Sequence, residues 1–260
     1  MDKHLKSLIE ARSHDPFAVL GRHAANNIET FRALLPHAEV AHIGESGPEL
    51  HRIPGTDIFE CQVDHGNEIP QHYEINWRDR TGRKFCHTDP YTFPAQIADF
   101  DLYLFGEGKH LHIHRILGAH LQTVDGIEGV LFATWAPNAE RVSVVGDFND
   151  WDGRTYLMRT RGSSGVWELF IPGIKPDTLY KFEIRNRQHG TVMLKTDPYG
   201  QRFELRPDTA SIVTALDTYQ WRDSEWLAAR KERDWQREPM SIYEVHLGSW
   251  RKNAQGGFLN

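Results

Sequence analysis

Thr88-Asp89-Pro90-Tyr91 and Thr196-Asp197-Pro198-Tyr199 are two copies of one short element, each near the end of a block of strand-like sequence. In such an element the aspartate can accept backbone hydrogen bonds in a turn, the proline fixes φ, and the tyrosine can cover the edge of a sheet. These roles are structural, so we interpret the element as a folding motif. Its recurrence predicts that the two blocks are themselves related.

The two blocks match at three further places, in the same order along the chain. Four matches in one order predict that a whole module has been duplicated. The three further pairs are Pro36-His37-Ala38-Glu39 with Pro137-Asn138-Ala139-Glu140, Phe59-Glu60 with Trp167-Glu168, and the run 73–77 with the run 180–184.

Between these landmarks, short apolar runs alternate with turn signals such as Ser46-Gly47-Pro48 and His65-Gly66-Asn67. This spacing is typical of antiparallel β-sandwiches. We therefore expect a mainly β fold of two tandem immunoglobulin-like antiparallel β-sandwich modules, with short helices in the N-terminal segment and linkers. The expected divisions are a helical segment over 1–22, a first sandwich over 23–93, a connector over 94–122, a second sandwich over 123–219, and a linker with the start of a further domain over 220–260.

Several separated motifs make the second block recognisable. They are Trp135-Ala136-Pro137-Asn138, Val144-Val145-Gly146-Asp147-Phe148-Asn149-Asp150-Trp151, Gly165-Val166-Trp167-Glu168 and Tyr180-Lys181-Phe182. Together they resemble the carbohydrate-binding module shared by branching enzymes, isoamylases, pullulanases and glycogen-sensing kinase subunits. Downstream, residues 239–250 read Pro-Met-Ser-Ile-Tyr-Glu-Val-His-Leu-Gly-Ser-Trp. This stretch resembles the first strand of the (β/α)8 catalytic barrel of bacterial glycogen branching enzymes, which belong to the alpha-amylase superfamily.

The resemblance covers essentially the whole chain and implies the N-terminal portion of a bacterial 1,4-alpha-glucan branching enzyme. Such enzymes are retaining glycosyltransferases that cleave α-1,4-glucan and transfer the segment to a 6-hydroxyl. Retention needs two carboxyl groups about 5–5.5 Å apart, and in the family they lie on a barrel of about 250 residues.

Residues 242–260 have room for one barrel strand, and the rest of the barrel is absent. We therefore assign no catalytic residue and expect this stretch alone to be inactive. Its expected role is to bind or position glucan and to support the barrel. The alternative is a stand-alone glycogen- or starch-binding module without catalysis, and a third reading is a debranching hydrolase of the same superfamily.

The candidate glucan-binding residues lie in the loop 147–151 and at Lys181. A glucan presents apolar C–H faces flanked by hydroxyls, so its site needs a flat aromatic ring with acids, amides or lysines at the rim. By the resemblance, Trp151 is the sugar platform, Asn149 and Lys181 can bond sugar hydroxyls, and Asp147 lies beside them. Trp151 could instead cap the sandwich or pack against the barrel.

Two departures from the family pattern limit the expected affinity. Modules that hold glycogen tightly carry a second exposed tryptophan after the Tyr-Lys-Phe strand, whereas residues 186–191 contain no aromatic residue. The first block has residues 42–46 in place of the tryptophan loop, so we expect that module to be mainly architectural. Trp135 and Trp167 lie within alternating strands and are expected in the core.

Composition excludes several other classes of protein. A formal charge of -6 with a pI near 6.2 and scattered basic residues gives no attraction to nucleic acid or anionic membranes. No 18-residue apolar run or signal peptide is present. Cys61 and Cys86 are expected as buried, reduced thiols of a cytoplasmic protein.

No cofactor, metal or second subunit is expected either. His110, His112 and His114 alternate as they would on one face of a strand, but no cysteine or carboxylate stands at a supporting spacing. The chain also lacks the glycine-rich nucleotide loop GxxxxGK[ST]. We therefore expect a monomer whose partner is α-1,4-glucan or glycogen.

Overall fold

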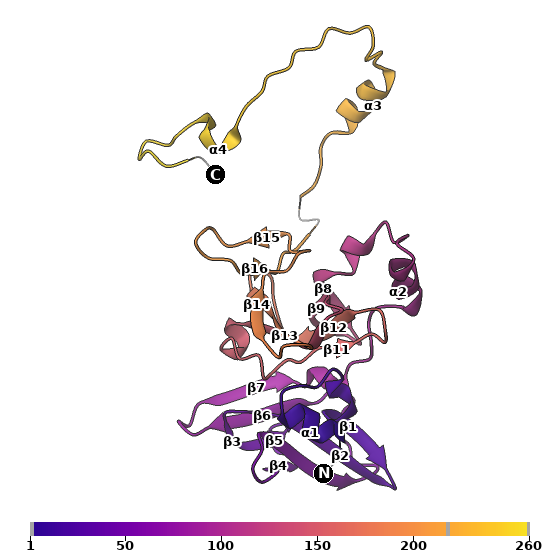
Figure 1. Ribbon diagram of the computed structural model, residues 1–260, viewed down its shortest axis with the longest axis vertical. Helices are drawn as coiled ribbons and strands as arrows, with labels where there is room; N and C mark the ends of the chain where they lie inside the picture. Colours follow the sequence, from indigo (N-terminus) through magenta and orange to yellow (C-terminus); the bar gives the residue numbers. More distant parts are fainter. Residues whose placement is uncertain (1–2, 217–218, 259–260) are drawn as a thin grey trace. The chain divides into compact units, whose positions relative to one another are not determined.

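The computed structural model describes residues 3–216 and 219–258 (Figure 1). Residues 1–216 form one compact unit and residues 217–260 a second. The first unit holds two modules built almost wholly from antiparallel strands. The prediction of a mainly β, antiparallel fold is thus confirmed.

The first module is one curled sheet of seven strands in the order β1-β2-β5-β4-β3-β6-β7. Its two halves pack face to face over a core that includes Phe31, Phe59 and Ile75, and β4 joins them by pairing with both β3 and β5. The module is therefore a sandwich closed along one edge. The strands are β1 (Gly21–Ala25), β2 (Ile28–Leu34), β3 (Ala38–Ile43), β4 (Glu49–Arg52), β5 (Ile58–Asp64), β6 (Glu74–Asp79) and β7 (Lys84–Thr88).

The second module keeps two separate sheets. One has the order β11-β12-β9-β8, and the other has the order β10-β13-β16-β15 with β14 on β13. Alternate residues of both sheets, among them Phe132, Val144 and Leu169, bury their side chains in a shared core. The strands are β8 (Gly118–Val124), β9 (Ile127–Trp135), β10 (Ala139–Gly146), β11 (Arg159–Thr160), β12 (Val166–Pro172), β13 (Leu179–Asn186), β14 (Val192–Lys195), β15 (Arg202–Phe203) and β16 (Ser211–Ile212).

The duplication predicted from sequence is visible in the strand pairing. The ladder β1-β2-β5 corresponds to β8-β9-β12, and β3-β6-β7 corresponds to β10-β13-β14. A register shift follows Ala38 in β3 and recurs after Ala139 in β10. Because such bulges are specific features of a strand rather than defects, their recurrence supports a common origin for the two modules.

The structure reveals a further repeat that the sequence analysis missed, Leu20-Gly21-x-His23 and Leu117-Gly118-x-His120. In each copy the histidine Nε2 lies 3.0 Å from the leucine carbonyl oxygen. Both glycines have positive φ, and a Cβ there would come within 2.8 Å of the carbonyl oxygen of Tyr91 or 3.3 Å of that of Tyr199. The first strand of each module therefore packs directly against its Asp-Pro-Tyr element.

Short helices complete the first unit. Helix α1 (Lys3–Ile9) covers part of the expected helical segment over 1–22, and Ala11 already has a φ of 53°. The other helical segments before the second module are η1 (Pro16–Ala18), η2 (Pro90–Thr92), α2 (Asp99–Gly106) and η3 (Ile113–Arg115). The three alternating histidines do not share one face of a strand, because this part of the connector turns at η3. Cys61 is buried, but Cys86 is exposed on the edge strand β7, so its expected burial is also wrong.

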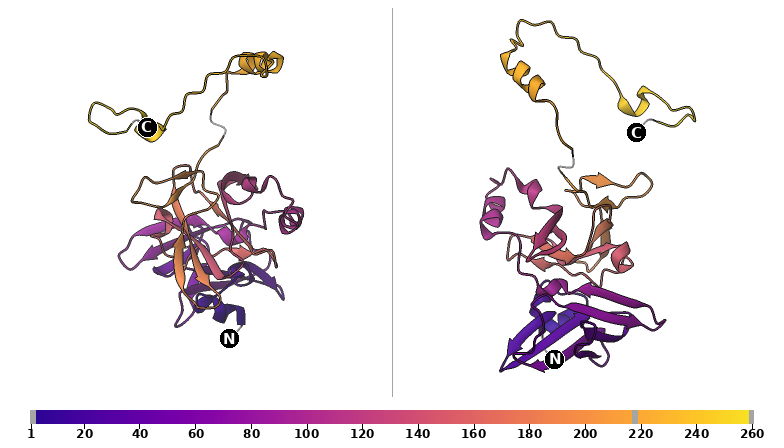
Figure 2. Two further views of the ribbon diagram at one scale, coloured as in Figure 1. Left: turned by 45° about the horizontal axis from the view of Figure 1, so that its top comes forward. Right: turned by 180° about the vertical axis from the view of Figure 1, so that it is seen from behind.

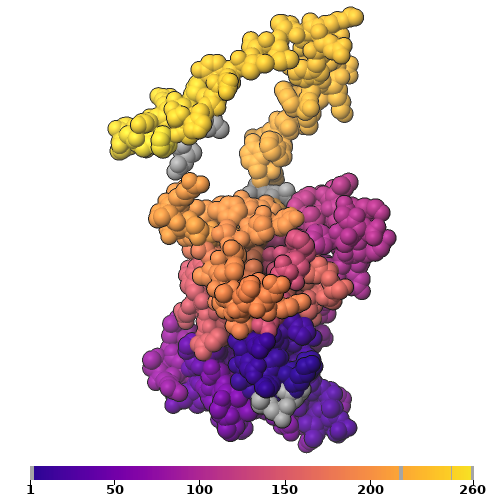
Figure 3. Space-filling view, viewed as in Figure 1, coloured from indigo at the N-terminus to yellow at the C-terminus, as the bar shows by residue number. Residues whose placement is uncertain are grey.

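The two modules are docked through polar and apolar contacts, and the second lies directly on the first (Figure 2). Glu140 accepts hydrogen bonds from Arg12 and Arg185 at 2.8 Å each. The Leu157 amide donates to the hydroxyl of Tyr91 at 2.9 Å. Leu157 also joins a buried cluster with Leu8 of α1, so the N-terminal segment lies across the junction (Figure 3).

The second unit contains α3 (Ser224–Glu232), α4 (Leu247–Trp250) and irregular segments. Residues 239–246 form no strand, so the expected barrel strand is not formed in this chain. Ile242 and Tyr243 are 86% and 77% exposed. A parallel barrel strand is stable only with neighbours on both edges and cover on both faces, and the described residues supply neither here.

Replacing Tyr73 by Phe tests the buried pair that it forms with Asp89. The Tyr73 hydroxyl donates to Asp89 at 2.6 Å, and burial raises the pKa of Asp89 to about 6. A carboxyl with a raised folded-state pKa stabilises the fold at low pH, and that stabilisation is lost as the pH rises through about 6. The hydroxyl favours the ionised form, so its loss costs more at high pH.

We expect Tyr73→Phe to lower the free energy of unfolding by about 1.5–3 kcal/mol at pH 7.5 and by about 0.5–1.5 kcal/mol at pH 4.5. Urea unfolding at the two pH values measures this difference. Tyr103→Phe, at an exposed position of α2, is the control and should change neither value. Equal losses at both pH values for Tyr73→Phe would contradict the assignment.

Candidate functional site

The candidate site is built on the loop between β10 and β11, which begins with η4 (Asp147–Asn149). The Asn149 side chain holds this loop together. Its Oδ1 accepts from the Gly146 amide at 2.9 Å, and its Nδ2 lies 3.0–3.1 Å from the Val144 carbonyl, the Asp152 carbonyl and the Thr155 hydroxyl. The amide of Asn149 thus makes its bonds inside the loop and shapes it.

The loop then turns through two residues in the left-handed region. Asp150 has a φ of 53° and Trp151 a φ of 58°. Left-handed geometry is common for aspartate and asparagine but unusual for a bulky residue, and it costs on the order of 1–3 kcal/mol. The Trp151 amide recovers part of this cost by donating to the Gly146 carbonyl at 3.0 Å. Strain of this kind at a ring of this size is a feature of ligand-contact positions.

Trp151 lies beside three polar groups. Its indole Nε1 donates to Asp147 at 2.8 Å, and the ammonium of Lys181 lies 5.9 Å from its ring centroid. Lys181, on β13, also donates to Thr209 at 2.8 Å. Asp147 therefore stands at the edge of the ring and the ammonium of Lys181 over its face, so both place polar groups beside the aromatic surface.

All four candidate residues come together in this loop and on the adjoining strand, but with different roles. Trp151, Lys181 and Asn149 are all half-buried, but the side-chain amide of Asn149 makes its hydrogen bonds inside the loop. Thr209 was missed by the sequence analysis. It lies in the turn between β15 and β16, and no local motif marks it; it reaches Lys181 because β16 pairs with β13.

The other two tryptophans of this module differ in burial. Trp167 is 2% exposed in the core, as expected. The expected burial of Trp135 is wrong, because 53% of its surface is exposed. It is the last residue of β9, beyond the sandwich core, where its indole donates to the Ser164 carbonyl at 3.2 Å and its ring rests against Phe105 of α2.

Comparison with known protein families defines the class of each module. Residues 116–200 match carbohydrate-binding module 48, the isoamylase N-terminal domain. Residues 1–91 match the N-terminal domain of the alpha-1,4-glucan branching enzyme GlgB. The second module is therefore a carbohydrate-binding module, preceded by a domain found at the start of branching enzymes.

Comparison with individual proteins identifies the family of the chain. The chain is 59% identical over 97% of its length to the 1,4-alpha-glucan branching enzyme GlgB of Methylococcus capsulatus. It is 53% identical over 100% of its length to that of Cellvibrio japonicus and 54% identical over 98% to that of Nitrosococcus oceani. The chain belongs, as an N-terminal portion, to the bacterial 1,4-alpha-glucan branching enzymes of the alpha-amylase superfamily. It spans 34–36% of the length of these relatives.

The remaining features of the described residues add little chemistry. Among residues 3–216 and 219–258, no helix is long and apolar enough to cross a membrane. The same residues contain no group of three or more His, Cys, Asp or Glu side chains placed to hold a metal ion. His110, for example, bonds Asp101 at 2.9 Å.

Replacing Asn149 by Asp tests whether its amide holds the loop. The variant keeps an acceptor for the Gly146 amide but loses the bonds that Nδ2 donates. We expect the free energy of unfolding to fall by about 1–3 kcal/mol at pH 7, because buried carbonyls lose their donor. Urea unfolding measures the loss. Asp147→Asn retains an acceptor for Trp151 and is the matched control; a loss as large in the control would remove Asn149 from this role.

Proposed function

We propose that this chain is the glucan-positioning, non-catalytic N-terminal region of a glycogen branching enzyme. In the whole enzyme, an α-1,4-glucan is cleaved and the segment is transferred to a 6-hydroxyl to make an α-1,6 branch. The observation that carries the proposal is the platform of Trp151, with Asp147 at its edge and Lys181 over its face, in a module of the carbohydrate-binding class. Asn149 acts by fixing the loop that presents the ring.

The platform supports weak binding of a single glucan segment. One aromatic face that covers roughly 100 Å² of apolar sugar surface supplies roughly 2–3 kcal/mol, and association costs at least several kcal/mol. The region around residues 186–191 offers no second ring. A polymer such as glycogen, which engages several sites together, gains affinity through effective concentration. We therefore infer that the module retains a large glucan near the enzyme rather than selecting a short one.

The first module acts as a brace. It has the turn of residues 44–48, between β3 and β4, at the place where the second module has its tryptophan loop. It is held to the second module by the bonds of Glu140 and Tyr91 described above. The divisions at 22, 93, 122 and 219 remain our proposal for the domain boundaries.

A second surface supports the bracing role of the carbohydrate-binding module. Strand β14 leaves Val192, Met193 and Leu194 about half exposed, and Phe203 and Leu205 in and beside β15 are exposed as well. Exposed apolar side chains gathered along one edge of a sheet are typical of contact surfaces. We infer that in an enzyme of the relatives' length this edge packs against the catalytic part. The protein would act as a monomer in the cytoplasm, with glucan as its partner.

The stand-alone binding module is the competing function. A stand-alone module has the same platform but does not need residues 239–250, whose sequence resembles the first strand of a barrel. The identity over nearly the whole chain to branching enzymes favours the enzyme segment.

Trp151→Ala tests the platform. We expect the dissociation constant for maltoheptaose, measured by isothermal titration of the 260-residue chain, to rise by at least about tenfold, because roughly 2–3 kcal/mol of ring contact is lost. Trp226→Ala, which removes an exposed tryptophan of α3, is the matched control and should bind as the parent does. Equal affinity of the Trp151 variant and the parent would remove this ring from the site.

The chain by itself should form no branches. In the family the two catalytic carboxyl groups lie on the barrel, of which this chain resembles only the first strand. Incubation of the purified chain with amylose should therefore yield no α-1,6 linkages detectable by isoamylase debranching or by proton NMR. A branching activity that copurifies with the chain through a final sizing step and forms new α-1,6 linkages would overturn this expectation.

A further inference from the structure

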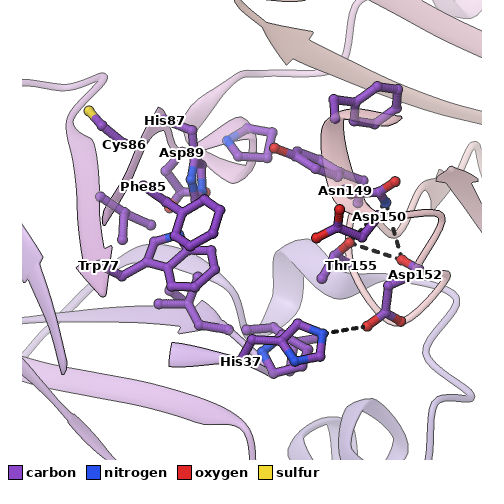
Figure 4. Close-up of a pocket in the computed structure, with 18 of the residues that line it drawn as sticks. His37, Trp77, Phe85, Cys86, His87, Asp89, Asn149, Asp150, Asp152 and Thr155 are labelled. Atoms are coloured by element: carbon purple, nitrogen blue, oxygen red, sulfur yellow. Dashed lines mark hydrogen bonds and ion pairs between the residues drawn. The ribbon is translucent and has the colours of Figure 1, made fainter. Parts of the chain in front are cut away.

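A cavity of about 180 Å³ lies between the two modules, apart from the Trp151 platform. Its first wall is the inner face of β6 and β7, with the segment 34–37 beside it, and its second wall is the loop 148–156. Figure 4 shows Trp77, Phe85 and His87 on one side and Asp150 on the other. We call this space the inter-module cavity. It opens on the side of the tryptophan loop that faces the first module.

The first wall carries a flat aromatic surface. Trp77 and Phe85 stand opposite each other on β6 and β7, with ring centroids 3.9 Å apart and an interplanar angle of 10°. His87 lies two positions along β7, on the same face as Phe85 because side chains alternate along a strand. On the loop, Tyr156 packs at the edge of His87 with centroids 6.4 Å apart. Aromatic walls of this kind suit the C–H faces of a sugar ring.

Three polar groups of the cavity are without partners among the described residues. The Trp77 indole Nε1 is buried and has no hydrogen-bond acceptor. No described residue bonds the His87 ring nitrogens, and burial lowers the pKa of His87 to about 4, so the ring is neutral at pH 7 and offers one donor and one acceptor. Asp150 points across the cavity toward the stacked rings (Figure 4) and has no described bond or ion pair. Of the three groups, the Trp77 nitrogen is buried, and buried polar groups are normally satisfied. It therefore points to a ligand, which the half-buried His87 and the exposed Asp150 are free to bond as well.

Charge and size narrow the class of ligand. Asp89, Asp150 and Asp152 line the cavity, whereas no lysine or arginine does. An anionic ligand such as a sugar phosphate is therefore disfavoured, and a neutral polyhydroxyl compound fits. The volume is well below the roughly 300–1,000 Å³ of pockets for drug-sized ligands, which leaves room for one ring and not for a chain.

We propose that the inter-module cavity binds the terminal glucosyl unit of an α-1,4-glucan, as a site separate from Trp151. The identity of the sugar rests on the proposed function; the geometry itself fits a single neutral ring. The ring lies against Trp77 and Phe85, and its hydroxyls bond His87, Asp150 and the Trp77 indole. A chain end held here occupies both modules at once, while the Trp151 face of the same loop remains free for another segment.

Indole N–H signals in nitrogen-15 NMR spectra of the 260-residue chain test the two sites separately. Trp77→Phe and Trp151→Phe assign the two signals. Maltose, up to about 50 mM and so well above a millimolar dissociation constant, should shift both in a saturable way. β-Cyclodextrin has no chain end and exceeds the cavity in size, so it should shift the Trp151 signal alone.

Two variants identify the cavity as the cause of the Trp77 shift. His87→Leu removes the ring nitrogens but keeps an apolar side chain, and Asp150→Gly keeps the left-handed turn. Each should raise the dissociation constant for maltose, obtained from the Trp77 shift, by about fivefold or more, because a hydrogen bond to the sugar is lost. Trp151→Ala should leave the Trp77 titration within about twofold of the parent. Urea unfolding confirms that each variant is folded.

The outcomes separate this inference from the proposed function. A Trp77 signal that does not move with maltose, while the Trp151 signal does, overturns the cavity site alone. A Trp77 shift that survives His87→Leu and Asp150→Gly unchanged, or that β-cyclodextrin also produces, overturns it as well. Failure of both signals to move with either sugar overturns the proposed function together with the cavity site.

Discussion

The fold depends on one buried interaction that occurs once in each module, the hydrogen bond from a tyrosine hydroxyl to an aspartate. Tyr73 donates to Asp89 and Tyr180 to Asp197, both at 2.6 Å. Each aspartate is 1% exposed, and its second oxygen accepts from the amide two residues onward. A buried carboxyl without such partners would cost several kcal/mol. These bonds therefore fix the backbone where the chain leaves the sheet in each module.

The same element links the modules to each other. After Asp89 the chain turns through Pro90 into Tyr91, whose backbone packs against Gly21 and whose hydroxyl accepts from the Leu157 amide of the second module. One corner thus closes the first module and docks it. Tyr199, its counterpart, packs instead among residues of the connector. The two Asp-Pro-Tyr elements therefore have the same local structure but different neighbours: Tyr91 docks the second module, and Tyr199 packs against the connector.

The two modules differ in the segment that follows β3 in the first and β10 in the second, where the candidate site lies. In the first, β4 continues the sheet between β3 and β5, so the backbone groups there are satisfied by strand pairing. In the second, residues 156–160 make the corresponding pairing, since Leu157 bridges Ser143 of β10 and β11 pairs with β12. A longer loop comes before them, and the amide of Asn149 satisfies part of its backbone. A loop held by a side chain rather than a ladder can adopt the left-handed turn at Asp150 and Trp151. The outer face of that loop presents the proposed platform, and its inner face closes the inter-module cavity.

The sequence by itself determined the features that depend on local pattern. Alternation of apolar residues gave antiparallel strands, the repeated Asp-Pro-Tyr element gave the duplication, and the loop 147–151 gave the candidate site. The tertiary structure decided what depends on residues distant in the chain. The exposure of Trp135 follows from where β9 ends relative to the core, and Thr209 reaches Lys181 only through the pairing of β16 with β13.

The Leu-Gly-x-His repeat and the inter-module cavity belong to this second group. The repeat is marked in sequence by few residues, and its meaning lies in the contact of a glycine with a distant tyrosine carbonyl. Residues 239–246 are the opposite case. Their sequence favours a strand, but they form none because the described residues offer no neighbouring strand with which to pair. Local pattern specifies which conformation a segment favours, whereas burial, pairing and cavities are set by which distant surfaces meet.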